Sequence, residues 1–216
     1  MSDRRPILYV LDDDSAVRDS LLNLFGSVGL RAKCFGTAQA FLRHSRPDCA
    51  SCLLLDVRLP GLSGIELQRE LNARGDRLPI IFMTAFGDIP MAVSAIKAGA
   101  DEFLTKPFRE QELLEAVGRA LERDTLARAE RAELLTLHGR WKRLTAKERE
   151  VMSRVVAGKS NKQIAADFAR SEFTIKAHRR HIMEKMSATS LTVLVRMADR
   201  LAKFEEHVQA PRRAIG

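Results

Sequence analysis

Residues 52–61 read Cys-Leu-Leu-Leu-Asp-Val-Arg-Leu-Pro-Gly. Four successive apolar residues are typical of a central parallel strand that is covered by helices on both faces. Asp56 follows this run directly. Because open α/β sheets bind their ligands at the carboxyl ends of the strands, we expect Asp56 to lie at a ligand-binding edge.

Similar apolar runs alternate with helix-like segments through the first part of the chain. The predicted strands cover residues 7–11, 30–35, 52–55, 80–83 and 102–105. Apolar residues at helical spacing predict helices at about 15–28, from 38, from 63, at 89–98 and at 110–121. This alternation is typical of repeated βα units. The sequence therefore predicts an α/β domain over residues 1–121, with a five-stranded, parallel, doubly wound sheet.

Chemically active side chains follow four of these strands. Asp12 and Asp13 end the first run, Thr84 ends the fourth and Lys106 ends the fifth, so all should meet Asp56 at one edge. Three converging carboxylates repel one another unless a cation is present. Their hard oxygen ligands suit Mg²⁺, or Mn²⁺. With Lys106 and Thr84 to neutralise and bind phosphoryl oxygens, Asp56 is predicted to accept a phosphoryl group.

The alternative is a set of solvated loop carboxylates beside an ordinary structural lysine. For any one of these residues that interpretation would be preferred. Five suitable residues, each at the end of a strand, favour the phosphoryl site instead.

Charge is distributed unevenly along the 216 residues, which suit two modest domains. Residues 1–121 carry a net charge of −1 and residues 122–216 carry +9. The second part is thus the candidate for contact with a polyanion. The sequence contains no apolar run of about 18 residues, so we expect no membrane segment, and a cytoplasmic location. The three cysteines fit reduced thiols better than a disulfide framework or a metal site.

Three longer stretches carry a family resemblance. They read LDDDSAVRDSL (11–21), LLLDVRLPGLSGIEL (53–67) and IIFMTAFGDIPMAVSAIKAGADEFLTKPF (80–108). In order, type and spacing they resemble the receiver domain of bacterial response regulators, which has a flavodoxin-like fold. The resemblance implies that a sensor histidine kinase phosphorylates Asp56. It also implies a metal ion held by Asp13, Asp56 and the backbone carbonyl of Arg58, with Asp12 assisting through water.

The same resemblance implies a switch that reports the phosphorylation state. Thr84 would turn toward the phosphoryl group while the ring of Phe103 turns inward, and the face around the fourth helix and fifth strand would change. Many relatives have tyrosine at the Phe103 position. Phe103 lacks the hydroxyl, so a readout that needs a hydrogen bond from this ring is excluded. The Lys106–Pro107 peptide bond is expected to be cis.

Residues 122–139 are rich in Ala, Leu, Glu and Arg and predict a helical linker that His138 and Gly139 end. Its apolar stripe is too weak for a coiled coil. Beyond it, helices are predicted from Thr145, from 161 to about 168, from 172 to 186 and from 190 to about 203, with capping boxes at Thr145 and Ser160. The core contacts predicted for the third of these helices are Phe173, Ile175, Ile182 and Met186.

Two short helices joined by a tight turn, the second rich in cations, indicate a helix-turn-helix. The segment LTAKEREVMSRVVAGKSNKQIAADFARSEFTIKAHRRHIMEKM resembles the LuxR-type DNA-binding domain, over residues 140–205 with the motif at about 161–180. With its receiver, the chain resembles NarL/FixJ-family regulators, FixJ and regulators of aromatic-compound degradation among them. Family position implies base-edge contacts by Lys176, Ala177 and Arg180. It implies phosphate contacts by Lys162, Thr174, Arg179, His181 and Lys185.

Ala169 departs from this pattern, because relatives often have glycine in the turn. If positive φ is needed there, alanine costs about 1 kcal/mol relative to glycine, and we expect a strained turn. Residues 206–216 are expected to form a flexible tail.

The favoured function is a phosphorylation-switched transcription regulator that forms a homodimer, binds promoter DNA and acts on RNA polymerase. An Asp-nucleophile phosphatase is disfavoured, because such enzymes carry a second Asp where this chain has Arg58. We therefore expect no enzymatic turnover. A phospho-signalling adaptor whose basic domain binds protein or RNA is the other alternative. The sequence does not distinguish an activator from a repressor.

Overall fold

The computed structural model describes residues 5–85 and 99–209, and the helix predicted at 89–98 lies outside them. The chain divides into two compact units, Met1–Arg128 and Ala129–Gly216. Each unit has its own apolar core.

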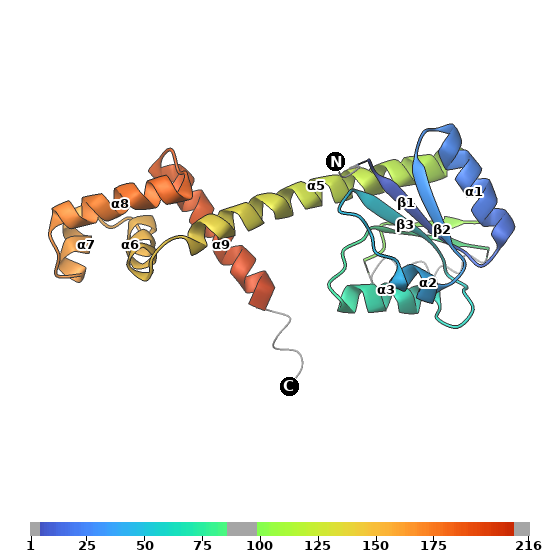
Figure 1. Cartoon of the computed structure of the whole chain (residues 1–216), viewed down its shortest axis with the longest axis horizontal. Helices are drawn as coiled ribbons and strands as arrows, with labels where there is room; N and C mark the ends of the chain where they lie inside the picture. The colour runs from blue at the N-terminus through green and yellow to red at the C-terminus, as the bar shows by residue number, and fades with distance from the viewer. Residues whose placement is uncertain (1–4, 86–98, 210–216) are drawn as a thin grey trace. The chain divides into compact units, whose positions relative to one another are not determined.

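The first unit contains a five-stranded sheet in the order β2-β1-β3-β4-β5, and every pair of neighbouring strands is parallel (Figure 1). This confirms the predicted α/β fold. The strands are β1 Ile7–Leu11, β2 Arg31–Phe35, β3 Ser51–Asp56, β4 Ile80–Thr84 and β5 Glu102–Thr105. All six residues of the central strand β3 are buried, as expected for a strand with helices over both faces.

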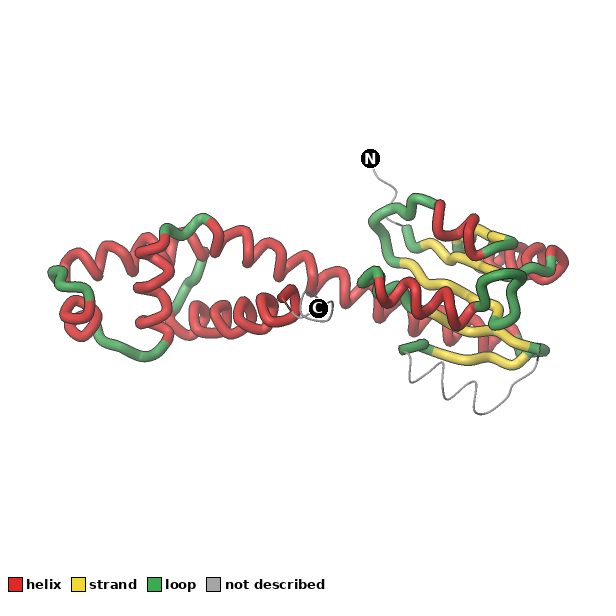
Figure 2. The backbone as a smooth tube through the Cα atoms, turned by 90° about the horizontal axis from the view of Figure 1, so that it is seen from below, coloured by secondary structure: helices red, strands yellow, loops and turns green. Residues whose placement is uncertain are grey.

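Helices cover both faces of the sheet, which lies between them in Figure 2. The helices are α1 Ser15–Ser27, α2 Ala38–Arg43, α3 Gly64–Ala73 and α5 Glu110–Lys142. One core cluster joins the sheet to α2 and α3, and the other joins it to α1 and α5. Helix α3 begins where predicted, because Ser63 and Glu66 form a reciprocal capping box.

Helix α5 is longer than the sequence predicted. His138 and Gly139 do not end it, and it runs without interruption for 33 residues, to Lys142. A glycine inside a helix costs about 1 kcal/mol, so packing must offset it. Leu137 is buried in the core of the second unit, Trp141 packs against that core, and the His138 ring lies 5.6 Å from the Trp141 ring. These contacts explain why the helix continues.

The second unit consists of the end of α5 with α6 Ala146–Val156, α7 Asn161–Asp167, α8 Glu172–Met186 and α9 Leu191–Gln209. Both predicted capping boxes are present, at Thr145 and Ser160. Helix α9 extends beyond its predicted end near residue 203, so the first residues assigned to a flexible tail are helical. Residues 210–216 lie outside the described part.

One predicted core contact is wrong. Ile175, Ile182 and Met186 are buried in the unit's core, but the side chain of Phe173 is 82% exposed. Successive residues of an α-helix differ by about 100° around its axis, so Phe173 lies about 200° from Ile175. Phe173 therefore belongs to the opposite face of α8.

Ala169 has φ +48°, which confirms the positive φ anticipated for the turn between α7 and α8. Its N–H donates to the carbonyl of Ala166, and the N–H of Arg170 donates to the carbonyl of Ala165. This is the backbone pattern in which glycine usually ends a helix.

Ala169→Gly is expected to stabilise the second unit by about 0.5–1 kcal/mol, because glycine removes the Cβ strain at positive φ and loses part of that gain to its freer unfolded chain. Urea unfolding of the full chain, followed at Trp141, measures it. Gly158→Ala is the matched control with the opposite sign, since Gly158 also has positive φ and an added Cβ would meet nothing within 4 Å. A lower unfolding midpoint for Ala169→Gly would contradict this account of the turn.

Candidate functional site

The ends of β1 and β3 bring three carboxylates together. Asp12 follows β1 and is buried, Asp13 is exposed, and Asp56 is the last residue of β3. One oxygen from each lies within 4.8 Å of the others, so the three could share a metal ion. The structure thus brings together the acidic residues that the sequence analysis selected.

Lys106 joins this cluster from the end of β5. Its Nζ donates to Oδ2 of Asp12 at 2.5 Å and to Oδ2 of Asp56 at 2.8 Å. The two hydrogen bonds and charges outweigh burial and raise the pKa of Lys106, so the ammonium stays charged. Burial raises the pKa of Asp12 despite its bond to Lys106. The Lys106–Pro107 peptide bond is cis, as expected.

Backbone groups hold the two buried carboxylates in place. The N–H of Asp14 donates to Oδ1 of Asp12, and the N–H of Arg58 donates to Oδ1 of Asp56, both at 3.0 Å. Arg18 donates from one guanidinium nitrogen to the carbonyls of Asp12 and Asp13, at 2.8 and 2.9 Å. Arg18 thereby fixes the acidic loop after β1.

Gly64 lies against the backbone of the central carboxylate. A Cβ added at Gly64 would lie 2.3 Å from the carbonyl oxygen of Asp56 and 3.1 Å from Cα of Val57. The N–H of Gly64 donates to the carbonyl of Val57 at 3.0 Å. Only glycine permits α3 to begin so close to the end of β3.

The two residues of the predicted switch lie on neighbouring strands. Thr84 ends β4, is buried, and accepts a hydrogen bond at its carbonyl from the N–H of Lys106. Phe103 on β5 is half-buried, and its ring centre lies 6.4 Å from that of Phe82. The fourth helix, on the face expected to change, falls at residues outside the described part.

A second polar network lies at the opposite end of β3. Asp124 of α5 is buried and accepts a hydrogen bond from the N–H of Ser51 at 2.8 Å. Arg128 donates to the same carboxylate oxygen and to Asp48. Helix α5 is thus attached to the first residue of the strand whose last residue is Asp56.

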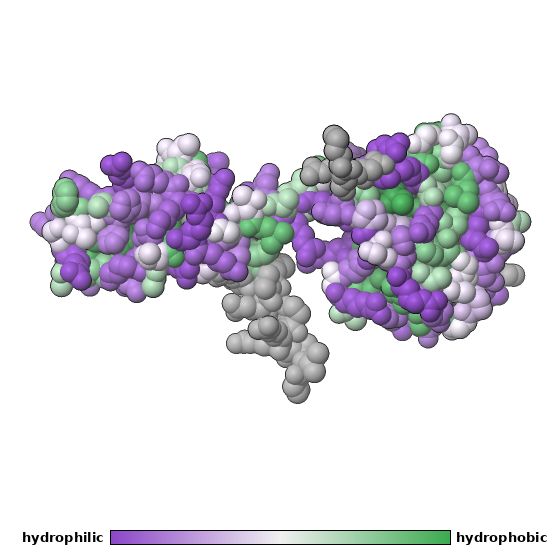
Figure 3. Space-filling view, viewed as in Figure 1, coloured by the Kyte–Doolittle hydropathy of each residue, from purple (hydrophilic) through white to green (hydrophobic). Residues whose placement is uncertain are grey.

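In the second unit, α8 presents a basic surface. Lys176, Arg180 and His181 are exposed, Ala177 and Thr174 are half-buried, and Lys162 is exposed on α7. Arg180 Nε donates to Glu184 at 2.8 Å. Figure 3 shows that the visible face of this unit is mainly hydrophilic.

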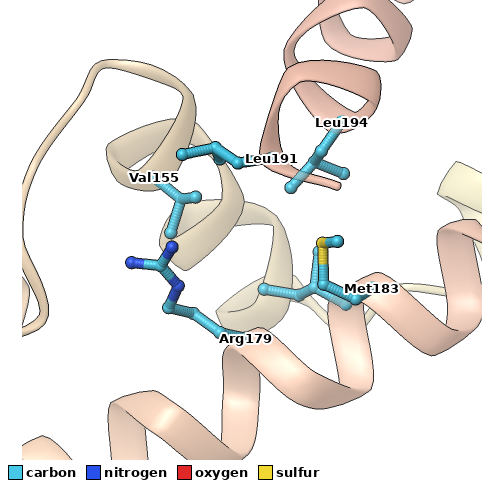
Figure 4. Close-up of a pocket in the computed structure, with 6 residues that line it drawn as sticks. Val155, Arg179, Met183, Leu191 and Leu194 are labelled. Atoms are coloured by element: carbon cyan, nitrogen blue, oxygen red, sulfur yellow. The ribbon is translucent and has the colours of Figure 1, made fainter. Parts of the chain in front are cut away.

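Two of the predicted phosphate contacts are engaged inside the unit. Arg179 donates to Asn161 at 2.8 Å and borders a cavity of about 130 Å³, where its side chain extends from α8 toward Val155 (Figure 4). Lys185 donates to both oxygens of the buried Glu148, at 2.8 and 2.7 Å. Burial acts to raise the pKa of Glu148, but the bonds from Lys185 and Thr145 outweigh it and lower that pKa. DNA phosphates would have to compete with these bonds.

The chain matches two family models. The response regulator receiver domain matches residues 8–118, and the luxR family of bacterial regulatory proteins matches residues 142–198. The chain belongs to the NarL/FixJ family of response regulators. This response regulator is therefore a phosphorylation-activated, DNA-binding transcription regulator of a two-component system, and its partners by class are a kinase and DNA.

Relatives of this response regulator match it over nearly their whole length. Nodulation protein W of Bradyrhizobium diazoefficiens is 47% identical over 205 residues, which are 95% of this chain and 90% of that protein. TodT, a response regulator protein of Pseudomonas putida, is 45% identical over 93% of this chain and 88% of its own length. The transcriptional regulatory protein FixJ of Bradyrhizobium diazoefficiens is 42% identical, over 92% and 97%. The solved structure of the response regulator StyR matches with a TM-score of 0.83 at 45% identity, covering 91% of this chain and 99% of that one.

Sequence reasoning missed several residues of the response regulator's sites. Gly64 had a usable signal, since it lies eight residues after Asp56 and directly follows the helix cap Ser63. Arg18 had none, because its partners are backbone carbonyls that only the fold brings near. The i,i+4 pair of Asp124 with Arg128 is visible in the sequence, but the bond from the N–H of Ser51 to Asp124 is not. In the described part of the chain, no helix combines the length and apolar character needed to cross a membrane.

Proposed function

We propose that Asp56 is the phosphoryl acceptor and that Lys106 and Thr84 bind the transferred group. One carboxylate oxygen of Asp56 attacks the phosphorus of a kinase phosphohistidine, the new P–O bond forms, the P–N bond breaks, and the imidazole leaves. The observation that carries this proposal is the position of Asp56 Oδ2, 2.8 Å from the Lys106 ammonium. That ammonium can follow the negative charge onto the phosphoryl oxygens.

We also propose that Mg²⁺, or Mn²⁺, is held by Asp13, Asp56 and the backbone carbonyl of Arg58, with Asp12 assisting. Three carboxylates and one ammonium leave an excess of negative charge in the cluster, and all of the side-chain donors are hard oxygens. When bound, the ion neutralises charge on the phosphoryl oxygens. Arg18, which fixes the backbone of Asp12 and Asp13, keeps those two ligands in position.

The phosphorylated receiver, we propose, forms a homodimer through a face that Thr84 and Phe103 control, binds paired promoter half-sites and acts on RNA polymerase. Lys176, Ala177 and Arg180 approach base edges, and Lys162, Thr174, Arg179, His181 and Lys185 contact phosphates. The exposed cations of α8 support this assignment.

The assigned regions are a receiver at 1–121, a linker at 122–139 and a DNA-binding domain at 140–205 with its helix-turn-helix at 161–180. The family matches at 8–118 and 142–198 support these boundaries. Residues 206–209 belong to α9 and not to a flexible tail.

Treatment with acetyl phosphate and Mg²⁺ is expected to shift the full chain from monomer toward dimer in sedimentation velocity. A chelator added beforehand should prevent the shift, and Asp56→Asn should not respond. A chain that takes up the phosphoryl group and stays monomeric would contradict the dimer step. A phosphorylated chain that binds RNA as well as it binds promoter DNA would favour the adaptor function instead.

A further inference from the structure

Phe173 is the unexplained residue on the DNA-binding unit. It is 82% exposed, whereas no other large hydrophobic side chain in the described part of the chain is more than 64% exposed. It lies at the second position of α8, after the N-cap Ser171. Burying a phenylalanine is strongly favourable, so the free protein leaves a large apolar contact unmade at this point.

The position of Phe173 on the helix limits what the ring can meet. Residues three, four and seven apart share one face of a helix, so Phe173 lies in line with Lys176, Ala177 and Arg180. These three are the residues proposed to approach base edges. Phe173 lies one turn nearer the N-terminus, and the N-terminal residues of a recognition helix are the ones that reach the base edges.

The partner of this face carries both negative charge and apolar groups. Lys176 and Arg180 lie on the same face as Phe173 and match phosphates and guanine acceptors. In the major groove the apolar group presented by base pairs is the C5-methyl of thymine, which phenylalanine side chains contact. A protein partner is less suited to this position, because its apolar patch would have to lie between two cations.

We propose that Phe173 packs against the C5-methyl group of a thymine in each half-site and so makes this regulator select a T·A pair there. The inference rests on the DNA-binding function of α8 and adds a residue to the base-reading set. It is a contact to one chemical group, so it can be tested by removing that group from the DNA.

The test uses the full chain treated with acetyl phosphate and Mg²⁺, with binding sites selected from a random DNA pool. Each thymine of the selected site is replaced in turn by deoxyuridine, which removes only the methyl group, and affinity is measured by fluorescence anisotropy at fixed salt. For the wild type, one position per half-site should lose roughly fourfold in affinity, the value of one buried methyl group. Phe173→Ala should bind the thymine site no more tightly than the wild type binds the deoxyuridine site. Its affinity should not fall further when deoxyuridine replaces that thymine.

Arg180→Ala is the matched control, because it removes a neighbouring contact and should weaken binding while keeping the sensitivity to the methyl group. Phe173→Leu should retain part of that sensitivity. If the Phe173→Ala substitution reduces affinity by the same factor on the thymine site and on the deoxyuridine site, relative to the wild type, Phe173 acts as a wedge or a protein contact and the proposal is overturned. A Phe173→Ala variant that selects the same sequence with the same affinity would overturn it as well. A wild type that selects no sequence would refute the base-reading function itself and not only the role of Phe173.

Discussion

Asp56→Asn is expected to remove essentially all phosphoryl labelling of the chain. The asparagine amide keeps the shape of the side chain and can still accept the N–H of Arg58, but it has no anionic oxygen to attack phosphorus. Loss of the Asp56 carboxylate also leaves Lys106 with one carboxylate partner instead of two. Labelling by acetyl phosphate in the presence of Mg²⁺, read by intact-protein mass, measures the effect.

Asp19→Asn provides the control, because Asp19 is an exposed carboxylate of α1 and its loss should leave labelling unchanged. Undiminished phosphate on the Asp56→Asn chain would place the acceptor on another residue. The same result would remove the basis for the proposed ligand set.

Gly64→Ala is expected to be among the most damaging single-methyl substitutions in the receiver. The added Cβ would lie 2.3 Å from the carbonyl oxygen of Asp56, so either α3 or the end of β3 must move. We expect a loss of about 3 kcal/mol in the free energy of unfolding of the receiver. Because small displacements of reacting groups strongly reduce rates, the initial rate of labelling should fall about tenfold or more.

Gly118→Ala is the matched substitution. Gly118 lies inside α5, an added Cβ there would meet nothing within 4 Å, and alanine should stabilise the helix by about 0.5–1 kcal/mol. Urea unfolding and labelling rates of both variants decide the matter. If Gly64→Ala has the same unfolding midpoint and the same labelling rate as the wild type, α3 does not press on the backbone of Asp56.

The receiver was predictable from sequence because its signals are local. Asp12, Asp56 and Lys106 each follow an apolar strand, and parallel strands place such residues at one edge. The two hydrogen bonds of Lys106 were not predictable, because they depend on side-chain conformations and join residues far apart in the sequence. Lys106 lies 94 positions from Asp12 and 50 positions from Asp56. The bond between Lys185 and Glu148 escaped prediction for the same reason.

Two errors have different causes. Gly139 is a correct local signal for the end of a helix, and packing of Leu137 and Trp141 in the second unit overrides it. Phe173 is apolar, but apolar character does not decide which face of a helix a residue occupies. Its offset of about 200° from Ile175 already assigned it to the other face, so helical period was the better guide.

The hydrogen bond between Asp124 and the N–H of Ser51 means that β3 is held at both of its ends. Its last residue carries the carboxylate that we propose accepts the phosphoryl group, and its first residue is bonded to the helix that continues into the DNA-binding unit. We therefore expect a displacement of this one strand to reach α5 directly, without passing through the ring of Phe103. If phosphorylation of Asp56 shifts α5 and strengthens DNA binding, thermodynamic linkage requires that DNA binding stabilise the phosphorylated state by the same coupling free energy.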